Sequence, residues 1–366
     1  MLEQFKEFIN SNGLFTPYNR ILIAVSGGVD SMVMLDLLNR CGYKIGIAHC
    51  NFNLRGTESD KDAEFVRKMA SEYKTSYYYK SFDTLEFAES NGLSVQMAAR
   101  DLRYEWFEEI RKKEGFDFIS TGHNLDDNVE TFFVNLLRGT GLTGLTGIPL
   151  KSGNVVRPVL FASRNEIHKY ASEMGIHFRT DSSNEETKYI RNKIRHEIIP
   201  LFKSMQSDFN VMMNETMQRL GQMNGLYMEY VNSLRSDLLK KEGERFVIRI
   251  NSIIDLDYPE TVLFELLKPF GFNSGMVNDL LSVMKNGIPG KQFIALSHIL
   301  TLDRDYLLID PKENSPKDNY IITRCKSGIK DPIYLDFKVK KINEIEITED
   351  PDYACLDYDK LEFPLS

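Results

Sequence analysis

Apolar strand-like runs alternate with helical stretches through the first half of the chain, and this alternation restricts the fold more than any other feature. Four runs are typical of buried strands, at residues 21–25, 44–50, 75–82 and 116–123. Each is followed by a stretch with helical periodicity, at residues 31–40, 57–74, 94–115 and 125–139. Repeated strand–helix units build a parallel sheet with helices on both faces. We therefore expect an α/β fold with a doubly wound, mainly parallel sheet.

The second half of the chain has a different pattern. Ser163 and Glu166 have the spacing of a capping box, which predicts a helix from that point. Residues 205–285 are mostly helical in periodicity and rich in methionine, residues 287–310 predict a two-stranded hairpin, and residues 316–366 are strand-rich and acidic. We predict three regions: a first domain at 1–205, a mostly helical domain with a hairpin at 206–312, and a strand-rich region at 313–366.

Composition excludes several broad classes of protein. No run approaches the roughly 18 uninterrupted apolar residues of a membrane span. The first ten residues, MLEQFKEFIN, carry two acids, unlike a secretory signal. We therefore expect a cytoplasmic protein with no membrane partner. The cysteines form no CxxC pair, which argues against a zinc ribbon or a disulfide framework; they are Cys41, Cys50, Cys325 and Cys355.

The net charge of −8 does not decide whether the partner is a nucleic acid. Residues 1–205 carry 26 Lys and Arg against 27 Asp and Glu, so the first domain is nearly neutral. The densest basic cluster lies at its end and comprises Lys188, Arg191, Lys193 and Arg195, with Tyr189 and His196 among them. We expect this cluster to contact a phosphodiester backbone, the alternative being an ordinary basic helix face.

The string SGGVDS, residues 26–31, separates the first expected strand from its helix. Its glycines let backbone N–H groups turn toward a ligand, and the helix start adds unpaired N–H groups and a partial positive charge. Such a cradle suits a phosphate group. No lysine follows the glycines, as it would in a Walker A motif, so we expect Mg²⁺ to neutralise the remaining charge. The alternative is a tight turn capped by Ser26 or Asp30.

The full string resembles the PP-loop of the ATP pyrophosphatase superfamily. The resemblance implies a PP-loop, adenine nucleotide alpha-hydrolase-like fold, and an enzyme that cleaves ATP between the α and β phosphates and transfers AMP to an oxygen. We expect ATP to be held by the whole loop, which comprises Ser26, Gly27, Gly28, Val29, Asp30 and Ser31. Val29 is a filler by type and should point into the core. Asp30 is the best loop candidate to hold Mg²⁺, directly or through water.

Five longer strings resemble the tRNA(Ile)-lysidine synthetase family and extend the resemblance over most of residues 20–202. They are HCNFNLRGTESDKD (49–62), AARDLRY (98–104), TGHNLDDNVETFFVNLLRGTGLTGLTGIP (121–149), RPVLFASRNEIHKY (157–170) and DSSNEETKYIRNKIRHEIIPLF (181–202). The chain departs from the family at Asn124, where a second His is common, and at Asn128 and Val129, where Gln and Ala are common. These departures make Asn124 a poor candidate for catalysis.

The family's reaction is a carbon–nitrogen ligation in two steps. ATP adenylates the oxygen at position 2 of the wobble cytidine in a CAU anticodon and releases pyrophosphate; the ε-amine of free lysine then displaces AMP. The resemblance therefore implies ATP and Mg²⁺ as cofactors, and L-lysine and tRNA(Ile) as partners. It also implies that the helical region helps to grip the tRNA and that longer relatives carry a further small domain, so we expect the end at Ser366 to be a truncation. The oligomeric state is left open between monomer and homodimer.

A second polar group follows the fourth expected strand and comprises His123, Asp126, Asp127 and Glu130. It lies where open α/β sheets bind ligands. The acids could bind Mg²⁺ or receive the lysine ammonium and later its proton, the alternative being acids placed favourably against the helix dipole. All four residues, with Asp30, are our catalytic candidates, and Asp30 and Asp127 are our candidate metal ligands.

Three arginines are candidates for binding phosphate, because a guanidinium group pairs bidentately with it. Arg100 and Arg103 lie three residues apart on the long expected helix, and we assign them to ATP. Arg55, in a loop, is a candidate to bind either ATP phosphate or tRNA. The basic cluster is a candidate to bind tRNA. The alternative for each is a solvated or ion-paired arginine. Of the histidines at strand ends, we expect His49 to be structural.

Two other functions stay open at this point. A PP-loop tRNA thiolase would need a persulfide-carrying cysteine or an iron–sulfur cluster, and only Cys50 lies near the site by sequence. A catalytically silent tRNA-binding module could retain the same fold, although every polar residue of the loop is present. A glutamine-dependent amidotransferase would need a glutaminase domain, and no such region is evident in the sequence.

Overall fold

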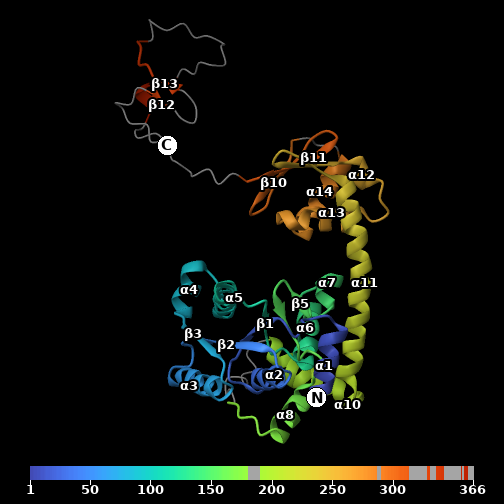
Figure 1. Cartoon of the computed structure of the whole chain (residues 1–366). Helices are drawn as coiled ribbons and strands as arrows, with labels where there is room; N and C mark the ends of the chain where they lie inside the picture. Colours follow the sequence, from blue (N-terminus) through green and yellow to red (C-terminus); the bar gives the residue numbers. More distant parts are fainter. Residues whose placement is uncertain are drawn as a thin grey trace. The chain divides into compact units, whose positions relative to one another are not determined.

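The computed structural model divides into two compact units, Met1–Tyr230 and Val231–Ser366 (Figure 1). The structure describes residues 1–179, 190–286, 290–312, 328–329, 335–341, 356 and 358–361. The three regions expected from the sequence, with boundaries near 205 and 312, stay a prediction. Among the described helices, none combines the length and the hydropathy needed to span a lipid bilayer.

A six-stranded sheet lies at the centre of the first unit, in the order β3-β2-β1-β4-β6-β5. Its strands are β1 (Arg20–Ala24), β2 (Lys44–Asn51), β3 (Ser76–Ser81), β4 (Phe118–Ser120), β5 (Lys151–Ser152) and β6 (Val155–Val156). All neighbouring strands are parallel except β5 and β6. The mainly parallel sheet is therefore confirmed. The sequence missed β5 and β6, because two residues are too few to show a period.

The helix predicted after each of four strands is present, whereas the sequence did not predict the helices over Leu2–Ser11, Thr84–Asn91 and Leu142–Leu145. In chain order the helices are α1 (Leu2–Ser11), α2 (Val29–Arg40), α3 (Thr57–Glu72), α4 (Thr84–Asn91), α5 (Val95–Glu114), α6 (Leu125–Leu137), α7 (Leu142–Leu145) and α8 (Arg164–Glu173). The capping box of Ser163 and Glu166 is present at the start of α8. After the undescribed residues 180–189 come α9 (Ile190–Lys193), a π-helical turn (Ile194–Ile198), α10 (Ile199–Met205) and α11 (Phe209–Leu238).

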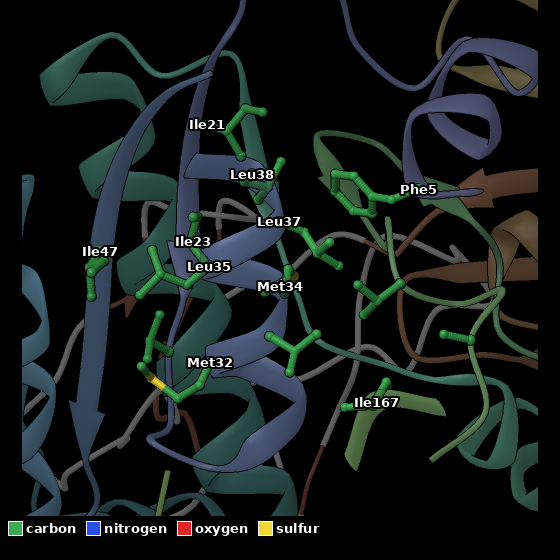
Figure 2. Close-up of a cluster of buried hydrophobic side chains, with 14 of the residues drawn as sticks. Phe5, Ile21, Ile23, Met32, Met34, Leu35, Leu37, Leu38, Ile47 and Ile167 are labelled. Atoms are coloured by element: carbon green, nitrogen blue, oxygen red, sulfur yellow. The ribbon is translucent and has the colours of Figure 1, made fainter. Parts of the chain in front are cut away.

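Strand β1 is apolar on both faces because helices cover both faces of the sheet. Ile21 and Ile23 join a core that includes the buried side of α2, as Figure 2 shows. Leu22, which points the other way, joins a second core with Trp106 and Phe107 of α5. A strand buried on both faces shows a continuous apolar run, as this one does. The doubly wound arrangement is therefore confirmed.

The second unit contains a five-stranded antiparallel sheet in the order β7-β8-β11-β10-β9. Its strands are β7 (Leu239–Glu242), β8 (Arg245–Arg249), β9 (Gln292–Ile294), β10 (His298–Leu302) and β11 (Tyr306–Pro311); its helices are α12 (Asn251–Ile254), α13 (Pro259–Leu267), a 3₁₀ turn (Lys268–Phe270) and α14 (Ser274–Asn286). Beyond residue 312 the described elements are β12 (Gly328–Ile329), β13 (Leu335–Asp336) and a 3₁₀ turn (Tyr358–Lys360).

The hairpin predicted over residues 287–310 is wrong in its number of strands. Three strands, β9, β10 and β11, form there, and β11 also pairs with β8 from far earlier in the chain. Local periodicity does not reveal pairing between distant strands. Most of the strand-rich region predicted at 313–366 lies outside the described residues.

Candidate functional site

Three neighbouring parallel strands end at one edge of the first sheet. The register of β1, β4 and β6 aligns Ile23 with Ser120, and Ser120 with Val156. The segments that follow these strands therefore start side by side at the carboxyl edge, where open α/β sheets bind ligands. They carry the SGGVDS loop, His123 and Arg157.

The SGGVDS loop has the geometry of an anion cradle. Gly27 is buried with φ +94°, a conformation that favours glycine. Gly28 is the N-cap of α2 and offers no side-chain oxygen there, so the first N–H groups of the helix are suited to an anion. The Ser31 hydroxyl donates to the Gly28 carbonyl at 2.9 Å and braces the turn. Val29 packs against the core, as expected of a filler.

Gly122 allows the end of β4 to approach this loop closely. A Cβ at position 122 would lie 3.1 Å from the Ser31 nitrogen and 3.2 Å from the Asp30 carbonyl carbon. Both neighbours are main-chain atoms and cannot rotate away. We expect Gly122→Ala to displace the loop and raise the KM for ATP by about tenfold or more. Gly221→Ala is the control, because open space surrounds that position; equal KM values for the two variants would contradict the close-packing argument.

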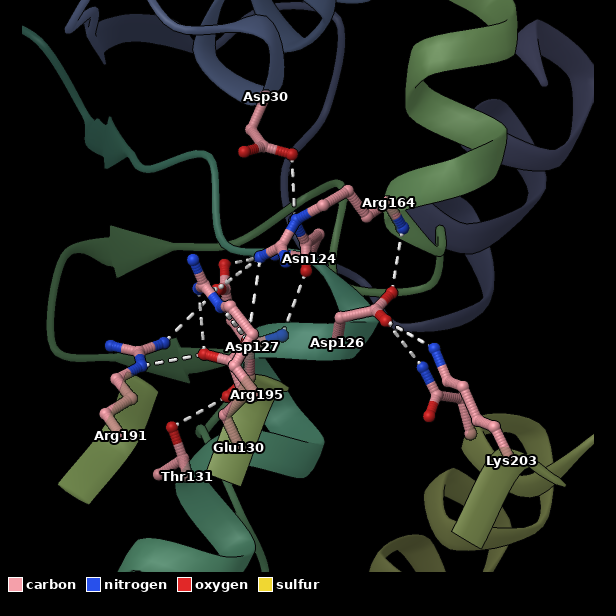
Figure 3. Close-up of polar contacts among 11 residues, drawn as sticks. Asp30, Asn124, Asp126, Asp127, Glu130, Thr131, Arg164, Arg191, Arg195 and Lys203 are labelled. Carbon is pink, nitrogen blue, oxygen red and sulfur yellow. Dashed lines mark hydrogen bonds and ion pairs between the residues drawn. The ribbon is translucent and has the colours of Figure 1, made fainter. Parts of the chain in front are cut away.

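Asn124 joins the loop to the acidic residues of α6. Its side-chain amide donates to Asp30 Oδ1 at 2.8 Å, as Figure 3 shows. Its own oxygen accepts the Asp127 N–H at 2.9 Å, and its main-chain N–H donates to Asp127 Oδ2 at 3.2 Å, which completes a capping box. Asn124 is fully buried. The sequence made Asn124 a poor candidate for catalysis. In the structure, however, Asn124 hydrogen-bonds to both candidate metal ligands, Asp30 and Asp127.

Asp127 and Glu130 face three guanidinium groups (Figure 3). Glu130, 1% exposed, accepts hydrogen bonds from Arg195 Nε at 2.6 Å and Arg191 Nε at 2.8 Å. Asp127 Oδ1 lies 3.2 Å from Arg191, 3.4 Å from Arg164 and 3.5 Å from Arg195. A buried carboxylate needs such partners, because an unpaired charge is costly away from water.

The two carboxyl groups differ in basicity. Burial raises the pKa of Asp127, against the opposing charge of Arg191. Burial would also raise the pKa of Glu130, but the hydrogen bond from Arg195 and the charge of Arg191 outweigh it and hold that pKa below its usual range. Asp127 is therefore the better proton acceptor of the two.

Asp126 belongs to a separate set of contacts, although it is adjacent in sequence. It accepts the main-chain N–H of Arg164 at 2.8 Å, the Lys203 ammonium at 3.0 Å and the Asn210 amide at 2.8 Å. Burial would raise the pKa of Asp126, but the N–H of Arg164 and the charge of Lys203 outweigh it and lower that pKa. Asp126 and Glu130, four residues apart on α6, nevertheless line one pocket.

His123 is neutral in this environment. Burial and the nearby charge of Arg157 lower the pKa of His123 to about 3, with smaller contributions from Arg191, Arg100 and Arg103. Its Nδ1 lies 3.0 Å from the Thr121 hydroxyl. A neutral imidazole can accept or donate a hydrogen bond near phosphate without adding charge.

Arg157 is a candidate residue of the functional site that was not predicted from the sequence. It is 5% exposed, and Nη1 donates to the Pro149 carbonyl while the buried Nε has no partner among the described residues. Burial lowers the pKa of Arg157, and the nearby Tyr104 opposes this. The string RPVL contains this residue, but a single arginine at a strand end has no period that would mark it as buried.

The other predicted arginines divide between two environments. Arg100 lies over the Tyr104 ring at 4.9 Å and Arg103 over the Phe52 ring at 5.2 Å. Arg55 contacts Asp62 at 2.6 Å. His49 accords with its predicted structural role, because it is buried and its Nδ1 lies 2.8 Å from the Val25 carbonyl oxygen.

Two arginines of the predicted basic cluster pair with acids, and the assignment of the cluster to tRNA stays a prediction. Arg191 and Arg195 turn toward Asp127 and Glu130, whereas Lys193 is exposed. Lys188 lies outside the described residues. The acidic partners are far earlier in the sequence, which explains why spacing alone did not predict this arrangement.

The carboxylates differ in how well they suit Mg²⁺. Asn124 occupies only Oδ1 of the partly exposed Asp30, which fits a ligand that shares the ion with phosphate and water. The guanidinium groups around Asp127 make it a poorer ligand. Within the described ranges, no group of three or more His, Cys, Asp or Glu side chains could hold a metal ion. This donor set suits an ion held largely by the nucleotide.

Known families match most of the chain. Residues 1–202 match the family model of the PP-loop domain, and residues 241–312 match that of the TilS substrate binding domain. The tRNA(Ile)-lysidine synthase of Bacteroides thetaiotaomicron is 37% identical over 357 residues, which are 97% of this chain and 80% of that protein. The tRNA(Ile)-lysidine synthase of Parabacteroides distasonis is 35% identical over 367 residues, or 100% of this chain and 83% of that protein.

One solved structure aligns only weakly with this chain. The U34-tRNA thiolase NcsA from Methanococcus maripaludis, with its 4Fe-4S cluster, aligns with a TM-score of 0.49 and 18% identity over 60% of this chain and 78% of that one. So low a likeness carries no conclusion about chemistry.

Proposed function

The chain belongs to the tRNA(Ile)-lysidine synthase family, and on this premise we propose that it joins free L-lysine to position 2 of the wobble cytidine in a CAU-anticodon tRNA(Ile). It is a ligase that uses ATP and forms lysidine on tRNA(Ile). One observation supports the finer proposal. A line of contacts leads from the loop through Asp30, Asn124 and Asp127 toward a pocket beside Glu130.

The first half of the reaction concerns the loop. The N–H groups at the start of α2 and the hydroxyls of Ser26 and Ser31 would hold the β and γ phosphates of ATP. Mg²⁺ bound beside Asp30 would neutralise phosphate charge. Arg100 and Arg103 would contribute further positive charge. AMP is transferred to the oxygen at position 2 of the cytidine, and pyrophosphate leaves.

The second half requires a neutral amine. The lysine side chain enters as an ammonium group and must lose its proton before nitrogen attacks the adenylated carbon. Asp127, whose pKa burial raises, is our candidate to accept that proton. The new carbon–nitrogen bond forms as AMP departs with the bonding electrons.

The pocket beside Glu130 is our candidate for lysine binding. It has a volume of about 510 Å³ and is lined by Asp126, Glu130, Arg164, Asn165, Arg195, Ile199, Pro200, Lys203 and Ser204. Two carboxylates and three cationic side chains in one pocket suit an amino acid, which carries charges of both signs. Two residues of its lining, Arg164 and Arg195, also contact Asp127.

We expect Lys203→Met to raise the KM for lysine by about tenfold while the KM for ATP changes less than twofold. The substitution removes a cation from the pocket and frees Asp126 Oδ1 from its ion pair at 3.0 Å; a charged hydrogen bond contributes about 1.5–3 kcal/mol. Steady-state kinetics with each substrate varied measures both constants. Lys169→Met, an exposed lysine on α8, is the control. An unchanged KM for lysine would remove the pocket from the proposal.

One assay tests the function as a whole. The protein is incubated with ATP, Mg²⁺, radiolabelled lysine and tRNA(Ile) that has a CAU anticodon, and label in the RNA is counted. Incorporation should require every component and should fail when the anticodon cytidine is replaced. Incorporation without ATP, or equal labelling of a tRNA lacking that cytidine, would contradict the proposal.

The two rival functions have less support. A thiolase would need a persulfide-carrying cysteine or an iron–sulfur cluster. Burial raises the pKa of Cys50 to about 12, so its thiolate is scarce near neutral pH. Cys325 and Cys355 lie outside the described residues. A silent binding module would not need Asp30, Asn124 and Asp127 joined by hydrogen bonds beside an anion cradle. Labelled lysine in the RNA would exclude both.

A further inference from the structure

A contact from far along the chain fixes the orientation of the phosphate-binding loop. The main-chain N–H of Arg179 donates to the Gly27 carbonyl at 2.9 Å. That carbonyl and the N–H of Gly28 belong to one planar peptide unit and point in opposite directions. The contact therefore helps to set the direction of the Gly28 N–H, which donates to the Ser26 hydroxyl oxygen at 3.3 Å. Within the loop the Ser26 hydroxyl holds this peptide unit at its N–H, and Arg179 holds it at its carbonyl.

The Arg179 side chain holds the backbone of that residue in place. Its Nε donates to Asp62 of α3, and its Nη2 donates to Glu58 Oε2 at 2.8 Å. Helix α3 also packs directly on the loop: a Cβ at Gly27 would lie 3.5 Å from the Phe65 ring and 3.6 Å from Val66. The loop is thus held from two directions by one helix and by a residue anchored to it.

Asp62 is the centre of this arrangement. It is 7% exposed, and each of its two oxygens accepts from a different arginine, Oδ1 from Arg179 and Oδ2 from Arg55 at 2.6 Å. Charge-assisted hydrogen bonds of this kind are stronger than neutral ones. One buried carboxylate therefore ties together three segments: the loop after β2, helix α3 and the chain before residue 180.

We propose that Asp62 is a positioning residue for ATP, which acts through Arg179 on the Gly27–Gly28 peptide. This inference rests on the proposed use of the SGGVDS loop for ATP. The proposal also changes the role of Arg55. The sequence suggested that Arg55 binds phosphate or tRNA, whereas in this proposal Arg55 fixes the Asp62 carboxylate, which in turn fixes Arg179.

The direction in which Asp62→Asn changes the KM for ATP shows whether Asp62 positions the loop or whether Arg55 and Arg179 bind phosphate directly. If Asp62 positions the loop, its loss lets the Gly28 N–H turn away, and the KM for ATP should rise about tenfold with kcat within twofold. If instead Arg55 and Arg179 bind phosphate themselves, removing their carboxylate partner should lower that KM. The Kd for tRNA should stay within twofold. Glu64→Gln, an exposed carboxylate on the same helix, is the matched control.

A second variant keeps the test sharp if Asp62→Asn folds poorly. Arg179→Gln leaves Asp62 paired with Arg55 and should raise the KM for ATP by about fivefold, while Arg179→Lys should restore most of the loss. The variant that combines Asp62→Asn with Arg179→Gln should have a KM for ATP no higher than that of Asp62→Asn alone, because both substitutions act through one contact. Additive losses, or a KM for ATP unchanged in a stably folded Asp62→Asn, would overturn the inference. If the wild-type chain fails to label tRNA with lysine, the proposed function fails instead.

Discussion

Asp30→Ala is expected to lower the rate of lysidine formation by about 10²- to 10³-fold while the Kd for tRNA stays within twofold. The substitution removes the loop carboxylate beside the expected phosphates and deprives the buried Asn124 amide of its partner at 2.8 Å. An unpaired buried donor also disturbs the cap that Asn124 provides to α6. Formation of adenylated tRNA, measured without lysine, isolates the half-reaction in which the loss should occur.

Asp30→Asn is the matched control for that experiment. Its amide oxygen can still accept from Asn124, so the geometry is kept while the charge is lost. If Asp30 contributes a metal-binding charge, the asparagine variant should be nearly as inactive as the alanine variant, and raised Mg²⁺ should restore part of the activity of both. Near-normal adenylation by Asp30→Asn would show that the side chain serves only to place Asn124.

The sequence predicted those parts of the site that depend on one short segment. The SGGVDS loop lies between a buried strand and a helix, and both show in the local pattern, so the position of the anion cradle follows from the residues alone. The same holds for the position of His123 and the α6 acids at a strand end. Each of these inferences needed only the period of a strand or helix and the rule that parallel strands end at one edge.

The pairing of those residues could not be predicted, because it depends on segments far apart in the chain. Arg191 and Arg195 form part of a basic string and were assigned to tRNA, yet they contact acids more than sixty residues earlier. Asn124 was judged by what relatives carry there, whereas its role comes from its distance to Asp30. A charge run shows which residues need partners but does not show which partners they find.

Glu130→Gln is expected to destabilise the first unit and to shift the pH dependence of ligation. Loss of the carboxylate leaves Arg191 and Arg195 facing a neutral group, at a cost of about 3 kcal/mol, the lower end for a buried pair because Arg191 is 44% exposed. That corresponds to a fall in Tm of about 6–12 °C. Because the folded pKa of Glu130 is held below its usual 4.5, its contribution to the free energy of unfolding is present above pH 4.5 and is lost as the pH falls through the folded value. Thermal unfolding of wild type and variant between pH 7 and pH 3 should therefore converge at acid pH.

The same substitution tests Asp127 as the proton acceptor. The negative charge of Glu130 helps to raise the pKa of Asp127, while Arg191 opposes it. Without that charge the pKa of Asp127 should fall, so the acid limb of the rate–pH profile for lysine attack should move to lower pH, and the plateau rate should drop because a weaker base accepts the proton. Glu166→Gln, an exposed capping residue on α8, controls for loss of a carboxylate elsewhere. A profile whose acid limb stays in place, in a variant that shows the expected fall in Tm, would mean that the proton goes to a group other than Asp127.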